Sequence, residues 1–301
     1  MGPSLACVVL NWNGGDRVLR CLRSVQESGG GKTALIMVDN GSTDGSPGRV
    51  AQALPGVEII AMGENAGLAH ARNRGLAHAM AGGAGYVLFL DDDAWLGPDA
   101  LARLVRVLEE APEAGIVTPR ILDARRRDRV WYDGGTASLL GGERHRSMGR
   151  THRPPEPGPV GSAFATGCCM LVRRAVFERI GGFAEEFFVY CEDADFSFRA
   201  RRWGFAVLHL SGAVAWHEQS GDTRANRGRW YRDYYVSRNT LLLRERHLCG
   251  WRRPAGRVAT LARLVCVVLP YLLVTLQGKR VLGVLRGVAH GLQRRWGGVY
   301  R

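Results

Sequence analysis

Three consecutive carboxylates, Asp91-Asp92-Asp93, directly follow the apolar run YVLFL at residues 86–90. Like charges held this close repel one another, and a hard divalent cation would relieve the repulsion. Mg²⁺ and Mn²⁺ are often held by one or two carboxylates together with substrate phosphates. The pattern predicts a metal site in which Asp91 and Asp93 are ligands and Asp92 reaches a ribose. The alternative is that these acids cap a following helix.

A second acidic group, Glu192-Asp193-Ala194-Asp195, precedes a segment with helical spacing. Asp195 and Arg199 stand four residues apart and are expected to pair on one helix face, which is a structural role. Asp193 is the candidate general base, because a carboxylate within hydrogen-bond reach can remove the proton of an attacking hydroxyl. The alternative is that these acids only favour a helix N-terminus through its dipole.

A single histidine, His217, stands in the string AWHE at residues 215–218. A lone histidine is more often structural than a metal ligand. If His217 joins the aspartates, its imidazole would favour ions such as Mn²⁺ over Mg²⁺.

Two further segments have the composition of nucleotide-binding loops. Asp39 opens the string DNGSTD and could accept a hydrogen bond from a base or ribose. Residues 65–73, NAGLAHARN, open a predicted helix whose N-terminus suits a diphosphate, and Arg72 adds a fixed positive charge. The alternative for both segments is an ordinary turn, since Asn, Gly, Ser and Asp are common turn residues.

Alternating strands and helices are expected to carry these residues. Apolar runs of strand length at 5–10, 34–38, 57–61 and 86–90 alternate with helical spacing at 16–26, 67–80 and 98–110. This order predicts an α/β fold with a mostly parallel sheet, which binds ligands at the carboxyl ends of its strands. Residues 123–162 are rich in Arg, Gly and Pro and predict a long loop region over the site. Order returns at 163–173, before a helix at 174–180.

The positive charge of the chain is concentrated at its C-terminal end. Of the net charge of +13, residues 244–301 carry +11, with twelve Lys or Arg and the single acid Glu245. The apolar run LVCVVLPYLLVTL within this tail has 13 residues, fewer than the roughly 20 that cross a bilayer. The tail therefore predicts either an amphipathic helix lying on an anionic membrane or a helix packed on the body.

The seven cysteines show no spacing typical of a disulfide framework or a zinc site. No basic region precedes the first apolar run, which therefore predicts a strand and not a signal peptide. Both observations lead us to expect a protein of the reducing cytosol.

Seven strings, taken together and in order, resemble the family-two glycosyltransferases, most closely the rhamnosyltransferase-like and galactofuranosyltransferase-like members. They span roughly residues 5–239 and read VVLNWNG, VDNGSTDGS, NAGLAHARNRG, LFLDDDA, TGCCMLVRR, GGFAEEFFVYCEDADFSFRARRWGF and AWHEQSG. The Gln-x-x-Arg-Trp motif of processive synthases is missing, which favours transfer of one sugar per encounter.

The resemblance implies a GT-A fold over residues 1–243, with a nucleotide-sugar-binding half at 1–122 and an acceptor-binding half at 123–243, followed by a basic helical tail at 244–301. It implies inverting transfer from a dTDP- or UDP-sugar to a hydroxyl acceptor, with Asp193 as base. The acceptor could be a lipid-linked saccharide, a cell-wall glycan or a secondary metabolite.

The resemblance also implies roles for the remaining site residues. Asp91, Asp93 and His217, which lies 24 residues after Asp193, are expected to bind Mn²⁺ or Mg²⁺. The nucleotide contacts are expected from Asn11, Asp39, Asn65, Gly67, Arg72 and Asp92. The expected location is cytoplasmic, peripheral on the inner face of the cell membrane, without nucleic-acid binding. The rival hypothesis is a non-catalytic sugar-nucleotide-binding or membrane-adaptor protein of the same fold.

Overall fold

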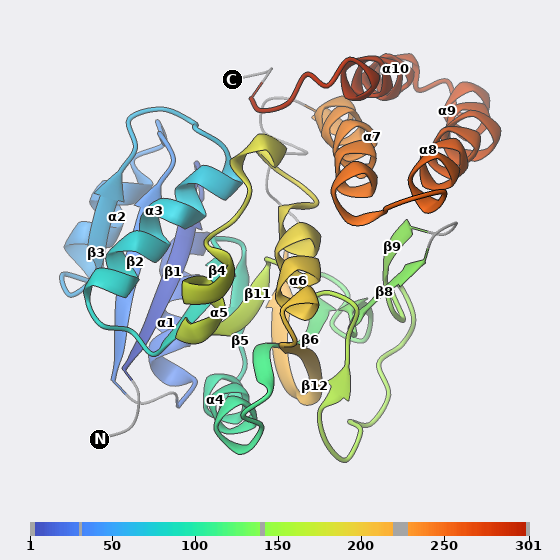
Figure 1. The fold of residues 1–301 in the computed structure, drawn as a ribbon. Helices are drawn as coiled ribbons and strands as arrows, with labels where there is room; N and C mark the ends of the chain where they lie inside the picture. Colours follow the sequence, from blue (N-terminus) through green and yellow to red (C-terminus); the bar gives the residue numbers. More distant parts are fainter. Residues whose placement is uncertain (1–3, 30–31, 139–141, 219–227, 299–301) are drawn as a thin grey trace.

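The computed structural model describes residues 4–29, 32–138, 142–218 and 228–298. Within them a 10-stranded sheet forms the centre of the molecule (Figure 1). Eight of its strands follow the order β10-β12-β6-β11-β4-β1-β2-β3, while β5 pairs with β12 and β7 with β6. The strands are β1 (Leu5–Asn11), β2 (Thr33–Asp39), β3 (Glu58–Ala61), β4 (Tyr86–Asp91), β5 (Ala94–Leu96), β6 (Ala114–Asp123), β7 (Val130–Tyr132), β10 (Val160–Gly161), β11 (Cys169–Arg173) and β12 (Ala206–His217).

Helices cover both faces of this sheet, because its strands are apolar on both sides. Cys7 and Val9 of β1 pack in one core with α1 (Arg17–Glu27), α2 (Ser46–Ala53) and α4 (Ala100–Glu110). Ala6 and Val8 pack in the other core with α3 (Leu68–Ala81), α5 (Arg174–Ile180) and α6 (Glu192–Arg202). Strands β4, β1, β2 and β3 are parallel, as are β6 and β12, whereas β11 runs antiparallel between β4 and β6. The predicted mostly parallel α/β fold is confirmed.

The two longest strands, β6 and β12, are not anticipated by the sequence. β6 contains Thr118, Pro119 and Arg120, all buried, and a proline inside an apolar run argues against a central strand. β12 alternates buried and partly exposed residues and includes a shift in its register against β6 between Leu210 and Val214. Both strands are held by their sheet neighbours and not by local propensity.

The prediction of a long loop at 123–162 is wrong in part. Besides β7 and β10 this region holds a two-stranded sheet of β8 (Gly135–Ser138) and β9 (Gly142–His145). These strands are short and rich in glycine and polar residues, so their pattern does not distinguish them from turns. Residues 139–141 of the expected loop lie outside the described residues.

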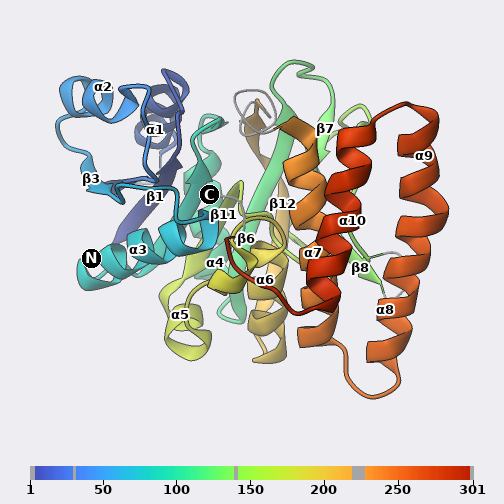
Figure 2. The same cartoon turned by 90° about the horizontal axis from the view of Figure 1, so that it is seen from above.

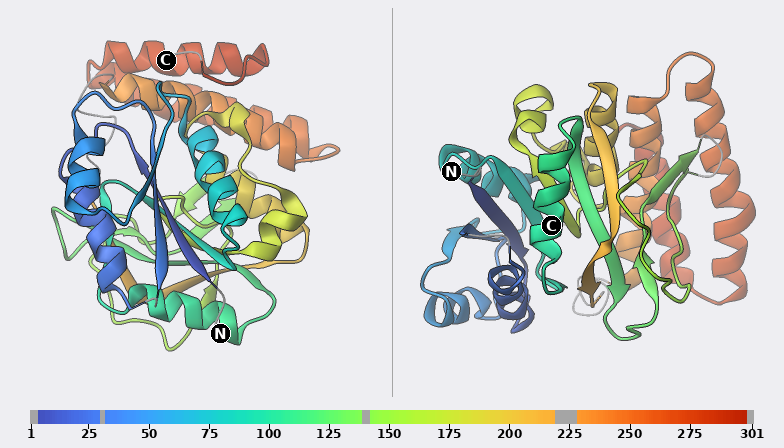
Figure 3. Two further views of the ribbon diagram at one scale, coloured as in Figure 1. Left: turned by 90° about the vertical axis from the view of Figure 1, so that its left-hand side faces the viewer. Right: turned by 90° about the horizontal axis from the view of Figure 1, so that it is seen from below.

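The C-terminal segment forms a group of helices at one end of the sheet (Figures 2 and 3). It comprises α7 (Gly228–His247), α8 (Arg252–Arg263), the π-helical turn η2 (Leu264–Val268), α9 (Leu269–Val274) and α10 (Gly278–Leu292). α10 lies close against α7, as two of its glycines show. A Cβ added at Gly283 would lie 2.4 Å from the carbonyl oxygen of Trp230, and one added at Gly287 would lie 2.3 Å from that of Tyr234. Of the two alternatives given for the tail, packing on the body is therefore the one that applies to α10.

The proposed boundary between body and tail at residue 243 falls inside α7. None of the helices in the described part of the chain combines the length and apolar character needed to cross a membrane.

Candidate functional site

A cleft of about 1320 Å³ opens at the carboxyl ends of β1 and β4. The structure brings together in its lining nine of the ten predicted site residues: Asn11, Asn65, Gly67, Arg72, Asp91, Asp92, Asp93, Asp193 and His217. Asp39 is the tenth; it is buried behind the lining, next to Asn11. The cleft is large enough for two small substrates, since single-ligand pockets commonly measure about 300–1,000 Å³.

Asp91, Asp93 and His217 meet at one end of this cleft. His217 ends β12, and its Nε2 lies 3.1 Å from Oδ1 of Asp93. Donor atoms of Asp91, His217 and Cys168 all lie within 4.8 Å of one another. The other ring nitrogen of His217, Nδ1, is buried without a hydrogen-bond partner among the described residues. Two carboxylates and an imidazole converging on one point fit a divalent cation.

Cys168 was not predicted to be near this centre. Burial raises the pKa of its thiol well above the ordinary value, and the nearby Asp91 and Asp93 raise the pKa further. Carboxylates suit Mg²⁺ and Mn²⁺, whereas thiolates select softer ions, so the carboxylates and the imidazole are the natural donor set.

The guanidinium of Arg72 lies buried between two carboxylates. Its Nη1 donates to Oε1 of Glu192 at 2.6 Å and its Nη2 donates to Oδ1 of Asp91 at 3.1 Å. The side chain of Arg72 is only 1% exposed, so its charge is largely taken up by these partners. Arg72 ties the first turn of α6 to the end of β4, which sets the spacing between the two acidic motifs.

Glu192 is predicted to make stability depend on pH. Burial and then the neighbouring Asp193 raise the pKa of Glu192 to about 7, although Arg72 favours its ionised form. In metal-free buffer the folded chain then holds a proton that unfolded Glu192 releases above its ordinary pKa of about 4.3. The free energy of unfolding should therefore fall as pH rises from about 4.5 to about 7, by at most ~1.4 kcal/mol per pH unit.

Urea unfolding of the wild type and of Glu192→Gln across this range tests the assignment. The variant lacks the titrating group, so the difference between the two curves should change over the same window. Parallel curves would show that Glu192 keeps an ordinary pKa in the folded state.

Asp193 follows Glu192 but faces a different environment. Its Oδ2 accepts the backbone N–H of Gly167 at 2.9 Å, and its Oδ1 accepts that of Ala194 at 2.8 Å. Asp193 is partly exposed to the cleft, whereas Glu192 is buried. Of the two adjacent acids, only Asp193 is placed to meet a substrate. Asp195 has the predicted structural role, with Arg199 Nε 2.8 Å from its Oδ2.

The segment before α6 is strained, and α7 holds it in place. Phe188, Tyr190 and Cys191 have φ values of 64°, 67° and 70°, which are unfavourable for residues other than glycine. The side-chain amide of Asn239 donates to the carbonyl oxygens of Phe187, Val189 and Tyr190 at 2.9, 2.8 and 2.8 Å. Asn239 is fully buried, so this bonding fixes the chain that leads into Asp193.

Asn239→Leu is expected to lower kcat about tenfold or more and to leave Mn²⁺ affinity unchanged. The variant keeps the side-chain size but removes the amide donor from three carbonyl groups, of which that of Phe187 still accepts from Arg238, at a cost of about 1–3 kcal/mol in stability. Steady-state kinetics with metal titration measures both quantities. Thr260→Val, which removes a buried hydrogen bond to Gly256 within α8, is the control and should not change kcat. An equal loss of kcat in the two variants would mean that Asn239 acts only through the general stability of the fold.

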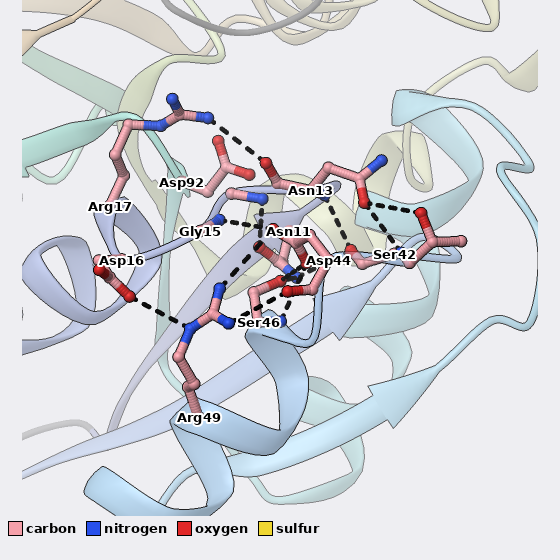
Figure 4. A network of polar contacts seen from close by, with 12 residues as sticks. Asn11, Asn13, Gly15, Asp16, Arg17, Ser42, Asp44, Ser46, Arg49 and Asp92 are labelled. Atoms are coloured by element: carbon pink, nitrogen blue, oxygen red, sulfur yellow. Dashed lines mark hydrogen bonds and ion pairs between the residues drawn. The ribbon is translucent and has the colours of Figure 1, made fainter. Parts of the chain in front are cut away.

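The loop after β1 is held by the predicted string DNGSTD (Figure 4). Asn11 is fully buried, and its Nδ2 donates to Asp39 at 2.9 Å, to Ser42 at 3.0 Å and to Ser46 at 2.9 Å. The side chains of Asn11 and Asp39 are therefore engaged with each other. Asp92 accepts the backbone N–H of Trp12 at 3.1 Å, which places its carboxylate against the same loop.

Asn65 and Gly67 shape the entrance to α3. Asn65 Oδ1 accepts the Gly67 N–H at 3.0 Å and the side-chain amide of Asn40 at 3.1 Å. Gly67 has a φ of +93°, and a Cβ there would lie 2.4 Å from the Phe188 ring. Only glycine fits this approach, so the position is structural as well as part of the cleft lining.

Two residues important for the site, Trp131 and Asn239, were not among the predicted site residues. Trp131 packs edge-on against His217 and His145, with ring centroids 4.3 and 4.7 Å apart, and stands in the region predicted as a loop. A tryptophan among Arg and Gly residues is the one local hint of a binding surface. Asn239 had no local hint, because its partners are 49–52 residues away. Residues 219–221, which end the string AWHEQSG, lie outside the described residues.

The central sheet flanked by helices, with an acidic cleft at the carboxyl ends of its strands, has the architecture of the GT-A fold. A mannosyltransferase of Pyrobaculum calidifontis, solved in complex with GDP-Man and Mn²⁺, superposes with a TM-score of 0.61 at 18% identity, over 98% of this chain and 88% of the other.

Residues 6–181 match the model of glycosyl transferase family 2, and the chain belongs to that family. An N-acetylglucosaminyl-diphospho-decaprenol L-rhamnosyltransferase of Mycobacterium tuberculosis is 29% identical over 84% of this chain and 88% of its own length. A galactofuranosyltransferase of the same species is 26% identical over 68% of this chain and 34% of its own length.

Proposed function

We propose that this glycosyltransferase moves one sugar from a nucleoside-diphosphate donor to a hydroxyl acceptor with inversion, and that Asp193 is the general base. One observation carries the proposal: Asp193 is accessible in the same cleft as Asp91, Asp93 and His217. A carboxylate separate from the metal-binding group can take the acceptor proton while the leaving group departs on the other side. Attack from the face opposite the leaving group inverts the anomeric carbon.

Asp91, Asp93 and His217 would hold Mn²⁺ or Mg²⁺. When bound, the cation would stabilise the charge that develops on the nucleoside diphosphate. The solved mannosyltransferase complex with Mn²⁺ supports a divalent metal for this fold. Arg72 contributes by orienting Asp91 and by adding one positive charge beside the acidic group. Asn11, Asp39, Asn65 and Gly67 build the loops that receive the nucleotide, and Asp92 lies beside the first of them.

The acceptor is proposed to be a lipid-linked saccharide. The rhamnosyltransferase relative matches most of both chains, and its name describes a sugar joined through a diphosphate to a polyprenol. Rhamnose from dTDP-rhamnose is the corresponding donor, with UDP-sugars as the second candidates. The half-exposed indole of Trp131 offers a flat surface of the kind that packs against a sugar ring.

A thermal-shift panel of nucleoside diphosphates and nucleotide sugars, with and without Mn²⁺, tests the function. A metal-dependent rise in Tm with one donor, followed by its slow hydrolysis or transfer, is the expected result. A non-catalytic adaptor would bind the donor without consuming it. The absence of any nucleotide effect would reject the donor assignment.

The C-terminal helices are proposed to rest on an anionic membrane. The exposed face of α10 combines Lys279 and Arg286 with Leu282 and Leu285, which follow helical spacing. Removing the whole tail would uncover the buried face of α7, so point substitutions are the sharper test.

Lys279→Ala and Arg286→Ala should each weaken binding to phosphatidylglycerol vesicles about fivefold, because a basic residue near such a surface contributes about 1 kcal/mol. Vesicle co-sedimentation at low salt measures the change. Vesicle binding that is unaffected by the double variant would remove α10 from the interface.

A further inference from the structure

Four separate elements contribute arginines to the lining of the cleft. These residues, the arginine wall, are Arg144 of β9, Arg232 of α7, Arg263 of α8 and Arg280 of α10. The elements meet there because α7 packs on both α8 and α10, and because Arg263 approaches β9 at Gly142. Arg263 and Arg280 belong to the basic tail at 244–301.

Arg232 is the residue of the arginine wall whose charge is open to a ligand. Glu143, which precedes Arg144 in β9, also lines the cleft, and it lies 3.9 Å from Arg244, an arginine outside the lining. Asp233 pairs with Arg280 through two hydrogen bonds of 2.5 and 3.0 Å. Arg232 is exposed and forms no ion pair with the described residues. The part of the cleft near Arg232 therefore differs in sign from the part near Asp91.

His145 relates the arginine wall to Asp193 and to the metal-binding group. Trp131 packs against both His217 and His145, with ring centroids 4.3 and 4.7 Å apart. Arg232, Asp193 and His217 all lie within electrostatic range of His145: burial lowers the pKa of His145, Asp193 raises it, and Arg232 and His217 lower it. The base, the metal-binding group and Arg232 therefore lie around one histidine of the cleft lining.

We propose that the arginine wall binds a phosphate or diphosphate group carried by the acceptor. The inference rests on the proposed function, because it takes Asp193 as the point where the acceptor hydroxyl reacts. The donor diphosphate has its own proposed place beside the cation. A second anion fits the charge of Arg232 in this lining, and guanidinium groups match phosphate oxygens with paired hydrogen bonds.

Isothermal titration of the full chain with geranyl diphosphate and with geraniol tests the proposal. EDTA is present, so that no cation can hold a diphosphate at Asp91. The wild type is expected to bind geranyl diphosphate at least ~10-fold more tightly than geraniol, since hydrogen bonds to charged groups contribute about 1.5–3 kcal/mol each. Equal affinity for the two compounds would overturn the proposal.

Variants locate the binding. Arg232→Ala should weaken geranyl diphosphate binding about tenfold or more, and Arg232→Lys should retain part of the affinity. Arg286→Ala removes the same charge from an exposed position outside the cleft lining and should bind as the wild type does. An Arg232→Ala affinity equal to that of Arg286→Ala would overturn the arginine wall as the site.

A phospholipid headgroup is the other source of a phosphate, and vesicles distinguish it. Arg232→Ala should bind phosphatidylglycerol vesicles as the wild type does, while Arg286→Ala binds them more weakly. The reverse pattern would assign the arginine wall to the membrane and overturn the proposal. None of these measurements uses donor or metal, so a failure of the proposed sugar transfer would appear separately, in the nucleotide panel.

Discussion

Asp193→Asn is expected to abolish sugar transfer while the protein still binds its donor. The amide cannot accept the acceptor proton, and general-base catalysis contributes about 10²–10⁴-fold in rate. Its single side-chain oxygen can still accept one of the two backbone N–H groups that Asp193 holds, those of Gly167 and Ala194, so part of the local bonding is kept. Rates of transfer and donor-induced shifts in Tm, measured on the same preparation, give both quantities.

The control for this substitution is Asp99→Asn. Asp99 is exposed before α4, with a φ of 56° that asparagine tolerates, and it lies outside the cleft lining. This variant should react at the wild-type rate. If Asp193→Asn also retained full activity, Asp193 would not be the base.

Asp93→Asn and His217→Gln are expected to lower Mn²⁺ affinity at least ~100-fold. Each removes a donor from the group at the end of β4 and β12, and even substitutions beside metal ligands commonly cost 10–100-fold. Activity at micromolar Mn²⁺ should be lost and should return in part at millimolar Mn²⁺. Titration of activity and of nucleotide-induced Tm against metal concentration measures the shift.

Recovery of activity at high Mn²⁺ concentration distinguishes metal ligands from residues that only support the fold. A misfolded variant would not recover, and its Tm without ligand would fall. An unchanged metal requirement in both variants would move the cation away from Asp93 and His217. Asp99→Asn, with a similar loss of one charge, should keep the wild-type metal titration.

The acidic motifs show how far local sequence can lead. Asp91, Asp92 and Asp93 stand at the end of a strand because YVLFL is apolar and of strand length, and both facts are readable in the sequence. The alternation of strands and helices then places that end at the ligand-binding edge of a sheet. The prediction that Asp91, Asp93, Asp193 and His217 share one cleft is borne out in the geometry, while their chemical roles stay predictions.

The strands β6 and β12 mark the limit of local patterns. Pro119 and Arg120 contradict the usual composition of a buried strand, yet both are buried because neighbouring strands and a pairing with Asp133 hold them. For a similar reason the sequence did not decide between two alternatives for the C-terminal region. The spacing of Gly283 and Gly287 indicates close helix packing only once α7 is known to lie against them.

The sequence by itself determined which residues can do chemistry and which kind of sheet carries them, because residue type and periodicity are local properties. Only the tertiary structure decided that Asp193 faces the cleft while Glu192 is buried under Arg72, that Asn239 holds the loop before α6, and that Arg144 and Arg232 line the same cleft. Those relations join residues far apart in the chain. They depend on how the helices dock on the sheet, which no local pattern encodes.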